Sequence, residues 1–285
     1  MDRKGVNGCD CDNNMTLGMA WVRETGSIRE LVIISDSRLS GGQSWDGNPK
    51  ILMLPRSDAV ISFAGSTNFA YPLMLQAYNA VNMYPRSKSR ALDITELKGH
   101  FIRIFNGTLK SINNFPVGQL IADNPDAFFL LCGYSWKFKT YKIWTLHYDD
   151  SIKEFTFRPT SDWGGQDGDA KKMIAFVGDK DAVTKAKEKL VLLLKETGKI
   201  STGSLDMEPF EILRDTIRST EFTSVGGPPQ IVKIYEHANA VPVGVYWPTK
   251  ESNQVCVLGR PLLGYEKFRD GIIDPDSPNR AFPQE

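Results

Sequence analysis

Three residues in the first fifth of the chain have side chains that could together activate a nucleophile. Thr16 carries a hydroxyl group, Asp36 directly follows an apolar run, and Lys50 directly precedes another apolar run. A threonine hydroxyl is a weak nucleophile at its ordinary pKa and needs a base beside it. One strand beginning after Thr16, one ending before Asp36 and one beginning after Lys50 could bring the three side chains to one point. The spacing therefore indicates a candidate site for nucleophilic catalysis by Thr16.

The base for this threonine would be its own α-amine if Thr16 were the first residue of the mature chain. An α-amine titrates near pH ~8, so it can accept a proton close to neutral pH. A cation at Lys50 would disfavour protonation of that amine and stabilise the hydroxyl as it loses its proton, and Asp36 would keep the lysine placed and charged. Backbone N–H groups would hold the oxyanion of the tetrahedral intermediate. Gly65, which follows a predicted strand, could offer such an N–H without a side chain in the way.

The chain resembles the proteasome β-subunit and its bacterial ring-protease relatives, the N-terminal nucleophile (Ntn) hydrolases. Three short segments carry the resemblance in this order: SDSR at 35–38, NPKIL at 48–52 and SFAGST at 62–67. The similarity is strong over residues 16–67 and weaker, although orderly, to about residue 247. It implies a threonine peptidase that attacks peptide bonds.

The resemblance also implies a role for each site residue. Thr16 would be the nucleophile and, through its amine, the base, with Asp36 and Lys50 as the activating pair. Arg38 would give structural support, and Gly65 would donate to the oxyanion. By analogy the family further implies a peptide or protein substrate, self-association into a homo-oligomer and an ATPase partner.

Two places in the chain depart from the family pattern. The residue before the nucleophile is usually glycine in self-processing members, whereas here it is Met15. Thr16 could be exposed by self-cleavage or by translation that starts at Met15, because a methionine before a small residue is readily removed. Family members also have an aspartate and a serine just before a glycine pair, where this chain has Glu221 and Ser224 before Gly226. Either Ser224 and Glu221 substitute with a shifted geometry, which makes Ser224 our candidate for a residue that orients the nucleophile, or these orienting residues have been lost.

A third position has two interpretations. In the family a serine supports the nucleophile at the turn between a strand and the next helix, and here Gly178 and Asp179 stand in that turn. Asp179 would either take the role of that serine or serve as the N-cap of the following helix. Aspartate is among the preferred N-cap residues, so we favour the cap.

Hydrophobic periodicity predicts the elements that must position these residues. Strands are expected on both sides of a hairpin turn at 25–27 and at 51–54, 59–64, 127–132, 142–148, 154–157, 173–177, 230–235, 241–246 and 254–259, and helices at 66–83, 94–112, 182–195 and 209–218. Asp93 and Glu96 have the spacing of a capping box at the start of the second helix.

This order of strands, two helices, strands, two helices and strands predicts an α+β layered architecture. Two antiparallel sheets packed face to face, with a helix layer outside each, would satisfy it. It agrees with the four-layer αββα sandwich of the Ntn hydrolases that the resemblance implies. We expect residues 1–15 to be a leader or unstructured, 16–260 to form the Ntn-hydrolase-like domain and 261–285 to be an irregular C-terminal extension.

Composition limits the partners and the compartment. Of the 285 residues, 41% are hydrophobic and 24% are charged, which is typical of a globular protein. Lys+Arg and Asp+Glu both number 34, so the net charge of zero predicts no nucleic-acid or membrane partner. The chain lacks an apolar run long enough to span a membrane, and its N-terminus lacks the apolar core of a signal peptide. We therefore expect a cytoplasmic protein.

Metal and cofactor sites are not expected. Cys132 and Cys256 lie in apolar strand patterns, and Cys9 and Cys11 lack two further soft ligands at zinc-site spacing. The acidic residues within 164–169 lack the ligand spacing of a calcium loop. The chain contains no phosphate-binding glycine motif and no GxSxG motif.

Two function classes remain open. The first is a threonine peptidase, or an amide hydrolase that uses the same nucleophile on a small molecule. The alternative is a catalytically inactive structural or binding subunit with the same fold. The N-terminus discriminates between them, because the amine base does not exist while residues 1–15 stay attached.

Overall fold

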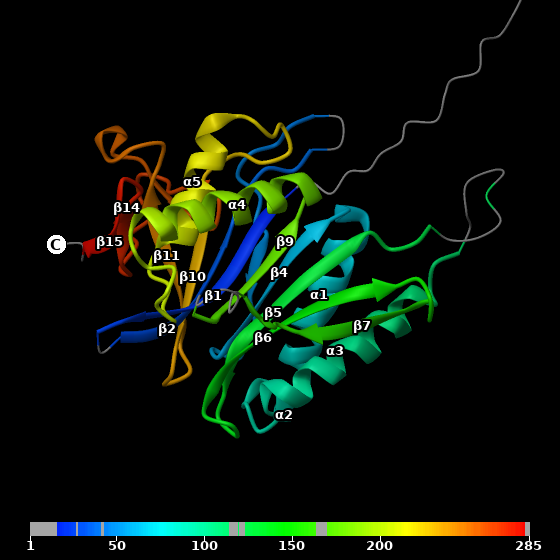
Figure 1. Ribbon diagram of the computed structural model, residues 1–285. Helices are drawn as coiled ribbons and strands as arrows, with labels where there is room; N and C mark the ends of the chain where they lie inside the picture. Colours follow the sequence, from blue (N-terminus) through cyan, green and yellow to red (C-terminus); the bar gives the residue numbers. More distant parts are fainter. Residues whose placement is uncertain are drawn as a thin grey trace, which may run out of the picture.

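The computed structural model describes residues 16–26, 28–40, 43–113, 119, 123–163 and 170–282, with side chains to residue 279. Within this part the protein has a mixed α+β fold with two antiparallel sheets and five α-helices (Figure 1). One sheet has ten strands and the other has five. The leader expected at 1–15 and the acidic segment at 164–169 lie outside the described residues.

The ten-stranded sheet is built around the first hairpin of the chain. Its central strands are β1 (Leu17–Thr25) and β2 (Ile28–Ser35), flanked by β9 (Lys172–Gly178) on one side and β10 (Gln230–Tyr235) on the other. The outer strands are β8 (Asp162–Trp163), β11 (Ala240–Tyr246), β12 (Val255–Val257), β13 (Arg260–Pro261), β14 (Ile272–Asp274) and β15 (Ser277–Phe282). Neighbouring strands are antiparallel except β11 and β14, which are parallel.

The five-stranded sheet is an antiparallel meander in chain order. Its strands are β3 (Ile51–Met53), β4 (Ala59–Gly65), β5 (Ala127–Ser135), β6 (Thr140–Asp149) and β7 (Glu154–Pro159). Between β4 and β5 the chain forms α1 (Thr67–Met83), α2 (Pro85–Lys88) and α3 (Ile94–Leu109). The helices α4 (Lys180–Glu196) and α5 (Glu208–Ser219) follow β9, and a short 3-10 helix η1 (Lys250–Ser252) precedes β12.

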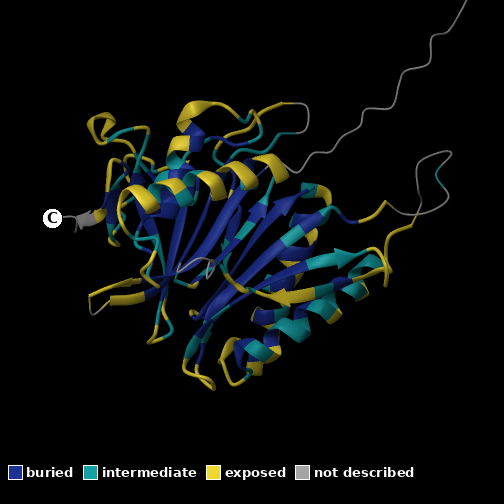
Figure 2. Ribbon diagram, in the orientation of Figure 1, coloured by how far each residue is buried: buried dark blue, intermediate teal, exposed yellow. Residues whose placement is uncertain are grey.

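Three hydrophobic clusters show how the elements pack. Because side chains alternate between the faces of a strand, β1 and β2 contribute to two of the clusters. Ala20 and Ile33 join residues of the five-stranded sheet, such as Leu130, in a cluster that both sheets share. Trp21 and Val32 point to the opposite face, where α4 and α5 cover the sheet. A third cluster joins the other face of the five-stranded sheet to α1 and α3. Figure 2 shows the result, with buried strands inside and exposed residues on the outer helix faces and turns.

The strands and helices predicted between residues 17 and 257 are present, with end points shifted by a few residues. The capping box is confirmed, since Asp93 accepts a hydrogen bond from Thr95 N at 2.9 Å and its own N–H donates to Glu96 Oε2 at 3.1 Å. The short helix α2, which begins at Pro85, was not among the predicted elements.

The C-terminal segment also differs from our expectation of no helix or strand after residue 261. β14 and β15 form a hairpin there, and β14 pairs with β11 at the edge of the ten-stranded sheet. Ile272 and Ile273 are buried in this hairpin. Within the described residues, no helix is long and apolar enough to cross a membrane.

Candidate active site

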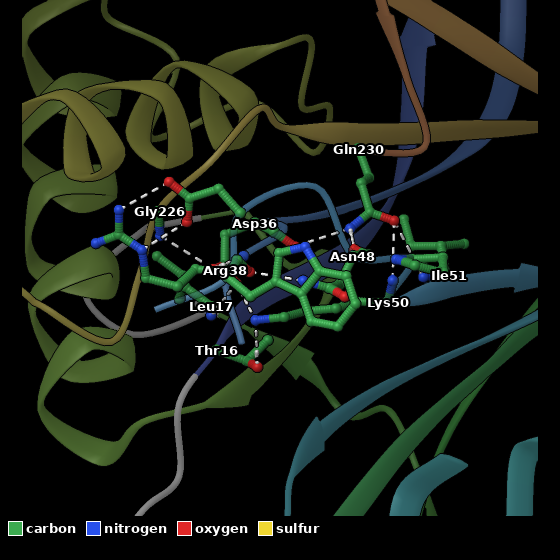
Figure 3. A network of polar contacts seen from close by, with 12 residues as sticks. Thr16, Leu17, Asp36, Arg38, Asn48, Lys50, Ile51, Gly226 and Gln230 are labelled. Carbon is green, nitrogen blue, oxygen red and sulfur yellow. Dashed lines mark hydrogen bonds and ion pairs between the residues drawn. The ribbon is translucent and has the colours of Figure 1, made fainter. Parts of the chain in front are cut away.

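The structure brings Thr16, Asp36 and Lys50 into direct contact (Figure 3). Lys50 Nζ lies 2.8 Å from Thr16 Oγ1 and 2.9 Å from Asp36 Oδ1. Asp36 and Lys50 are fully buried, and Thr16 is 1% exposed. The lysine ammonium therefore bridges a hydroxyl and a carboxylate away from solvent, as we predicted from their places at strand ends.

The strand register explains why the three side chains meet. β1 begins directly after Thr16 and β2 ends directly before Asp36, and the hairpin pairs Gly18 with Ser35. Just beyond this pair, Leu17 N donates to Asp36 Oδ1 at 3.1 Å, and Asp36 N donates to Leu17 O at 3.3 Å. Lys50 directly precedes β3 of the other sheet. The site thus lies where strands of both sheets begin or end.

Burial changes the chemistry of Lys50. Removing an ammonium group from water disfavours its charged form, so burial lowers the pKa of Lys50 from its ordinary value. The charge of Asp36 and the hydrogen bond to it act in the opposite direction. Burial has the larger effect of the two, so the lysine releases a proton more readily than an exposed lysine does. Such a group can stabilise the negative charge that develops on Thr16 Oγ1.

A second layer of contacts fixes Asp36 and Arg38. Asp36 Oδ2 accepts hydrogen bonds from the backbone N–H groups of Arg38 and Gly226, both at 3.1 Å. The Arg38 guanidinium binds Asp46 through two hydrogen bonds of 2.7 and 2.9 Å and donates to Thr223 O at 3.2 Å. The bond to Arg38 lowers the pKa of Asp46. A Cβ at Gly226 would collide with the guanidinium, so a side chain at this position would displace Arg38 from its place. This arrangement suits the supporting role predicted for Arg38.

Gln230, the first residue of β10, is a part of the site that sequence reasoning missed. Its fully buried Oε1 accepts from Lys50 N at 3.0 Å and from Ile51 N at 3.3 Å. Its Nε2 donates to Asp36 O at 3.0 Å and to Asn48 O at 2.9 Å. One carboxamide therefore joins the segments that carry Asp36 and Lys50. The only signal in the sequence was a polar residue at the start of an apolar strand.

Gly178 and Asp179 hold the backbone of Thr16. Asp179 N donates to Thr16 O at 2.9 Å. Gly178 has a φ of +138°, and a Cβ there would collide with the same carbonyl oxygen. The Asp179 side chain accepts from Asp181 N and Ala182 N at 2.9 and 3.0 Å. Asp179 is therefore the N-cap of α4, as we favoured, and contacts Thr16 through its main chain.

Gly65, Ser224 and Glu221 are the other residues for which the sequence predicted a role. Gly65 ends β4 with a φ of +105°, and a Cβ there would collide with Asp126 O. These facts explain the glycine, while its role as oxyanion donor stays a prediction. Ser224 is half-buried two residues before Gly226, whose backbone N–H is the group in that loop that contacts the site carboxylate. Glu221 instead pairs with Lys189 on α4 at 3.2 Å.

The described residues contain no cluster of three or more His, Cys, Asp or Glu that could hold a metal ion. Cys132 and Cys256 are buried, as their apolar strand patterns indicated, and burial raises the pKa of both thiols. The unassigned pair Cys9 and Cys11 lies outside the described residues.

Compared with protein-family models and with curated proteins, the sequence gives no match.

Proposed function

We propose that this protein is a threonine peptidase or amide hydrolase of the Ntn type, with Thr16 as the nucleophile. The observation that carries the proposal is the bridge formed by Lys50, whose ammonium contacts both Thr16 Oγ1 and Asp36 Oδ1 in a buried setting. A buried cation beside a hydroxyl lowers the cost of forming an alkoxide there. A threonine that only caps or fills a surface turn has no use for a buried ammonium group beside its hydroxyl.

The fold supports the same proposal. Helices cover the outer faces of two sheets that share a hydrophobic cluster. This order of layers is compatible with the four-layer αββα sandwich of the Ntn hydrolases. In that fold the nucleophile stands at the start of a strand, and Thr16 directly precedes β1.

The proposed reaction needs Thr16 as the first residue of the mature chain. Its α-amine takes the proton of the hydroxyl while Oγ1 attacks the carbonyl carbon of the substrate amide. The C–N bond then breaks, the amine passes the proton to the leaving nitrogen, and an ester to Thr16 remains. Water hydrolyses the ester with the same amine as base, which restores the hydroxyl. Lys50 stabilises the charge on the threonine oxygen, and the Gly65 N–H is the proposed donor to the oxyanion.

A second candidate function is that of a catalytically inactive subunit that binds or supports other chains. It is favoured by Met15, which stands where self-processing relatives have glycine. While those residues stay attached, Thr16 has an amide nitrogen in place of an amine. The constellation would then be a buried polar network only.

The wider setting belongs to the same proposal. A peptide or protein substrate, homo-oligomeric assembly, an ATPase partner and a cytoplasmic location follow from the family resemblance alone. Each stands or falls with the assignment of the chain to the Ntn hydrolases.

Intact mass measurement with N-terminal sequencing tests the proposal. Two chains are expressed, one beginning at Met1 and one at Met15, so that self-cleavage and alternative initiation are distinguished. We expect a mature chain beginning at Thr16 that hydrolyses peptide substrates, and no hydrolysis by the Thr16→Ala variant. Thr184→Ala, an exposed change on α4, is the matched control. An intact Met1 terminus in protein from its native cells, together with an inactive chain beginning at Thr16, would favour the inactive subunit.

A further inference from the structure

A strongly basic surface lies at the end of the five-stranded sheet away from the candidate active site. Its cations are Arg86, Lys88 and Arg90, in and directly after α2, and Lys137, Lys139 and Lys142, in and around the β5–β6 turn. The turn follows Gly133, which pairs with Ala59 at the opposite end of β4 from Gly65. In Figure 1, α2 and the β5–β6 turn lie together at this end of the molecule. We call these six cations, with Trp136 and Phe138, the basic–aromatic surface.

Hydrogen bonds join the two segments and fix the shape of the turn. Trp136 Nε1 donates to Arg90 O at 2.9 Å. Lys137 N donates to Asp93 Oδ2 at 3.3 Å, and Phe138 N donates to Ser135 Oγ at 3.1 Å. Ser135 Oγ in turn donates to the buried Asp93 carboxylate at 3.0 Å. The turn therefore presents its side chains from a preorganised backbone, which reduces the entropy cost of binding.

Within the described residues, no ion pair gives the cations of this surface a carboxylate partner. The segments 85–90 and 136–142 contain three cations each and no Asp or Glu, although the whole chain has a net charge of zero. Among the described residues, none of these six cations forms an ion pair. The first exposed acidic residue that follows α2 in the sequence is Glu96, at the start of α3. Six cations against the carboxylates of Asp93 and Glu96 leave an excess of positive charge for an anionic partner.

Two large aromatic side chains stand among these cations. Trp136 is 52% exposed and Phe138 is 57% exposed, at the tip of the turn. The ammonium groups of Lys142 and Lys137 lie 5.4 and 5.8 Å from the centre of the Phe138 ring. Aromatic side chains flanked by lysines match the interface of a lipid bilayer, where rings enter the headgroup region and ammonium groups contact phosphates.

We propose that the basic–aromatic surface binds the surface of an anionic membrane peripherally. Single-stranded nucleic acid fits less well, because base stacking needs a free ring face and lysine ammonium groups already lie near the Phe138 ring. A turn that projects from the sheet end also suits a flat surface. Our expectation of no membrane partner rested on net charge, which averages over this local excess of cations. The proposal is independent of the activity proposed for Thr16.

Co-sedimentation with phosphatidylcholine vesicles, with and without phosphatidylserine, tests the proposal on the full chain. We expect binding only to vesicles with phosphatidylserine, and weaker binding as salt is added. Each lysine near an anionic surface contributes about fivefold in affinity, so Lys137→Gln/Lys139→Gln should bind about 25-fold more weakly. Phe138→Ser should bind roughly fivefold more weakly with an unchanged salt dependence. Lys185→Gln/Lys195→Gln, on exposed positions of α4, is the matched control and should bind like the native chain.

Three results would overturn the proposal. The first is equal binding to vesicles with and without phosphatidylserine, or no binding to either. The second is an equal loss in the α4 control, which would show a nonspecific charge effect. The third is binding of polyuridylate, lost in Lys137→Gln/Lys139→Gln, without vesicle binding, which would assign the surface to nucleic acid. Unfolding temperatures of all variants identify any loss that comes from misfolding.

Discussion

Gln230 Oε1 accepts a hydrogen bond from the backbone N–H of Lys50 at 3.0 Å, inside the protein and 180 residues away along the chain. The same carboxamide donates to Asp36 O at 3.0 Å. A neutral side chain from β10 therefore holds the two segments whose charged side chains bridge to Thr16. The geometry of the charged pair depends on this third strand, because neither Asp36 nor Lys50 lies inside a strand of its own.

Replacing Gln230 by leucine should destabilise the protein. Leucine has no polar group, so the buried main-chain partners at Lys50 and Asp36 would lose a hydrogen bond each, and each buried unsatisfied group costs about 1–3 kcal/mol. We expect the free energy of unfolding in urea to fall by about 3 kcal/mol. Gln76→Leu, at an exposed position of α1, is the control and should change it by less than about 0.5 kcal/mol. Equal effects of the two variants would show that the carboxamide does not hold these segments.

Gly178→Ala should disturb Thr16 through its main chain. The φ of +138° and the collision of a Cβ with Thr16 O both oppose a side chain at this position. We expect the free energy of unfolding to fall by about 3 kcal/mol and hydrolytic activity to be lost. Gly198→Ala is the matched control, since Gly198 also has a positive φ, +68°, but open space around it. Its cost should be about 1–2 kcal/mol, with activity retained. A smaller cost at Gly178 than at Gly198 would contradict this account.

The buried Lys50 should make stability rise with pH in the alkaline range. Burial holds its folded-state pKa below the ordinary value of 10.5, so between these two pKa values the unfolded chain binds more protons than the folded chain. The contribution of Lys50 to the free energy of unfolding therefore increases as pH rises through that window and is constant below the folded pKa. Burial raises the pKa of the Cys132 thiol and of the Tyr71 hydroxyl, so these two groups contribute slopes of the opposite sign. Urea unfolding at a series of alkaline pH values measures this slope.

The matched variant for that experiment is Asp36→Asn/Lys50→Met, which removes both charges and avoids leaving one carboxylate buried and unpaired. We expect the slope of the free energy of unfolding against pH to be less positive in this variant than in the native chain. Lys185→Met, on the exposed face of α4, should keep the native slope. An identical slope in the double variant and the native chain would mean that Lys50 titrates at its ordinary pKa.

The site residues that could be predicted from the sequence are those whose positions depend on neighbouring residues in the chain. Thr16, Asp36 and Lys50 each stand next to a strand, and period-two patterns locate strand ends well enough to place them. Gln230 was missed because its importance depends on the pairing of β10 with β2, a long-range contact that no local pattern contains. The same limit applies to Gly226, whose N–H reaches Asp36 only after this pairing.

The C-terminal hairpin shows a second limit. β14 has three residues, too few to display a period, and it is held by neighbours rather than by its own pattern. Its pairing with β11 buries Ile272 and Ile273. Arg218 on α5 adds an ion pair of 2.6 Å to Asp276, in the turn of the hairpin. Only the folded sheet creates the edge on which such a short strand is stable.

Isosteric changes at Thr16 separate its chemistry from its packing. In a chain that begins at Thr16, Thr16→Val keeps the shape but removes the hydroxyl that contacts Lys50 at 2.8 Å, so peptide hydrolysis should fall by a factor on the order of 10³ or more. Thr16→Ser keeps the nucleophile and should retain measurable hydrolysis. Thr145→Val, at a buried threonine of β6, is the control and should leave the rate within about threefold of the native rate. Hydrolysis by Thr16→Val at the native rate would exclude this threonine as the nucleophile and leave the constellation as a buried polar network.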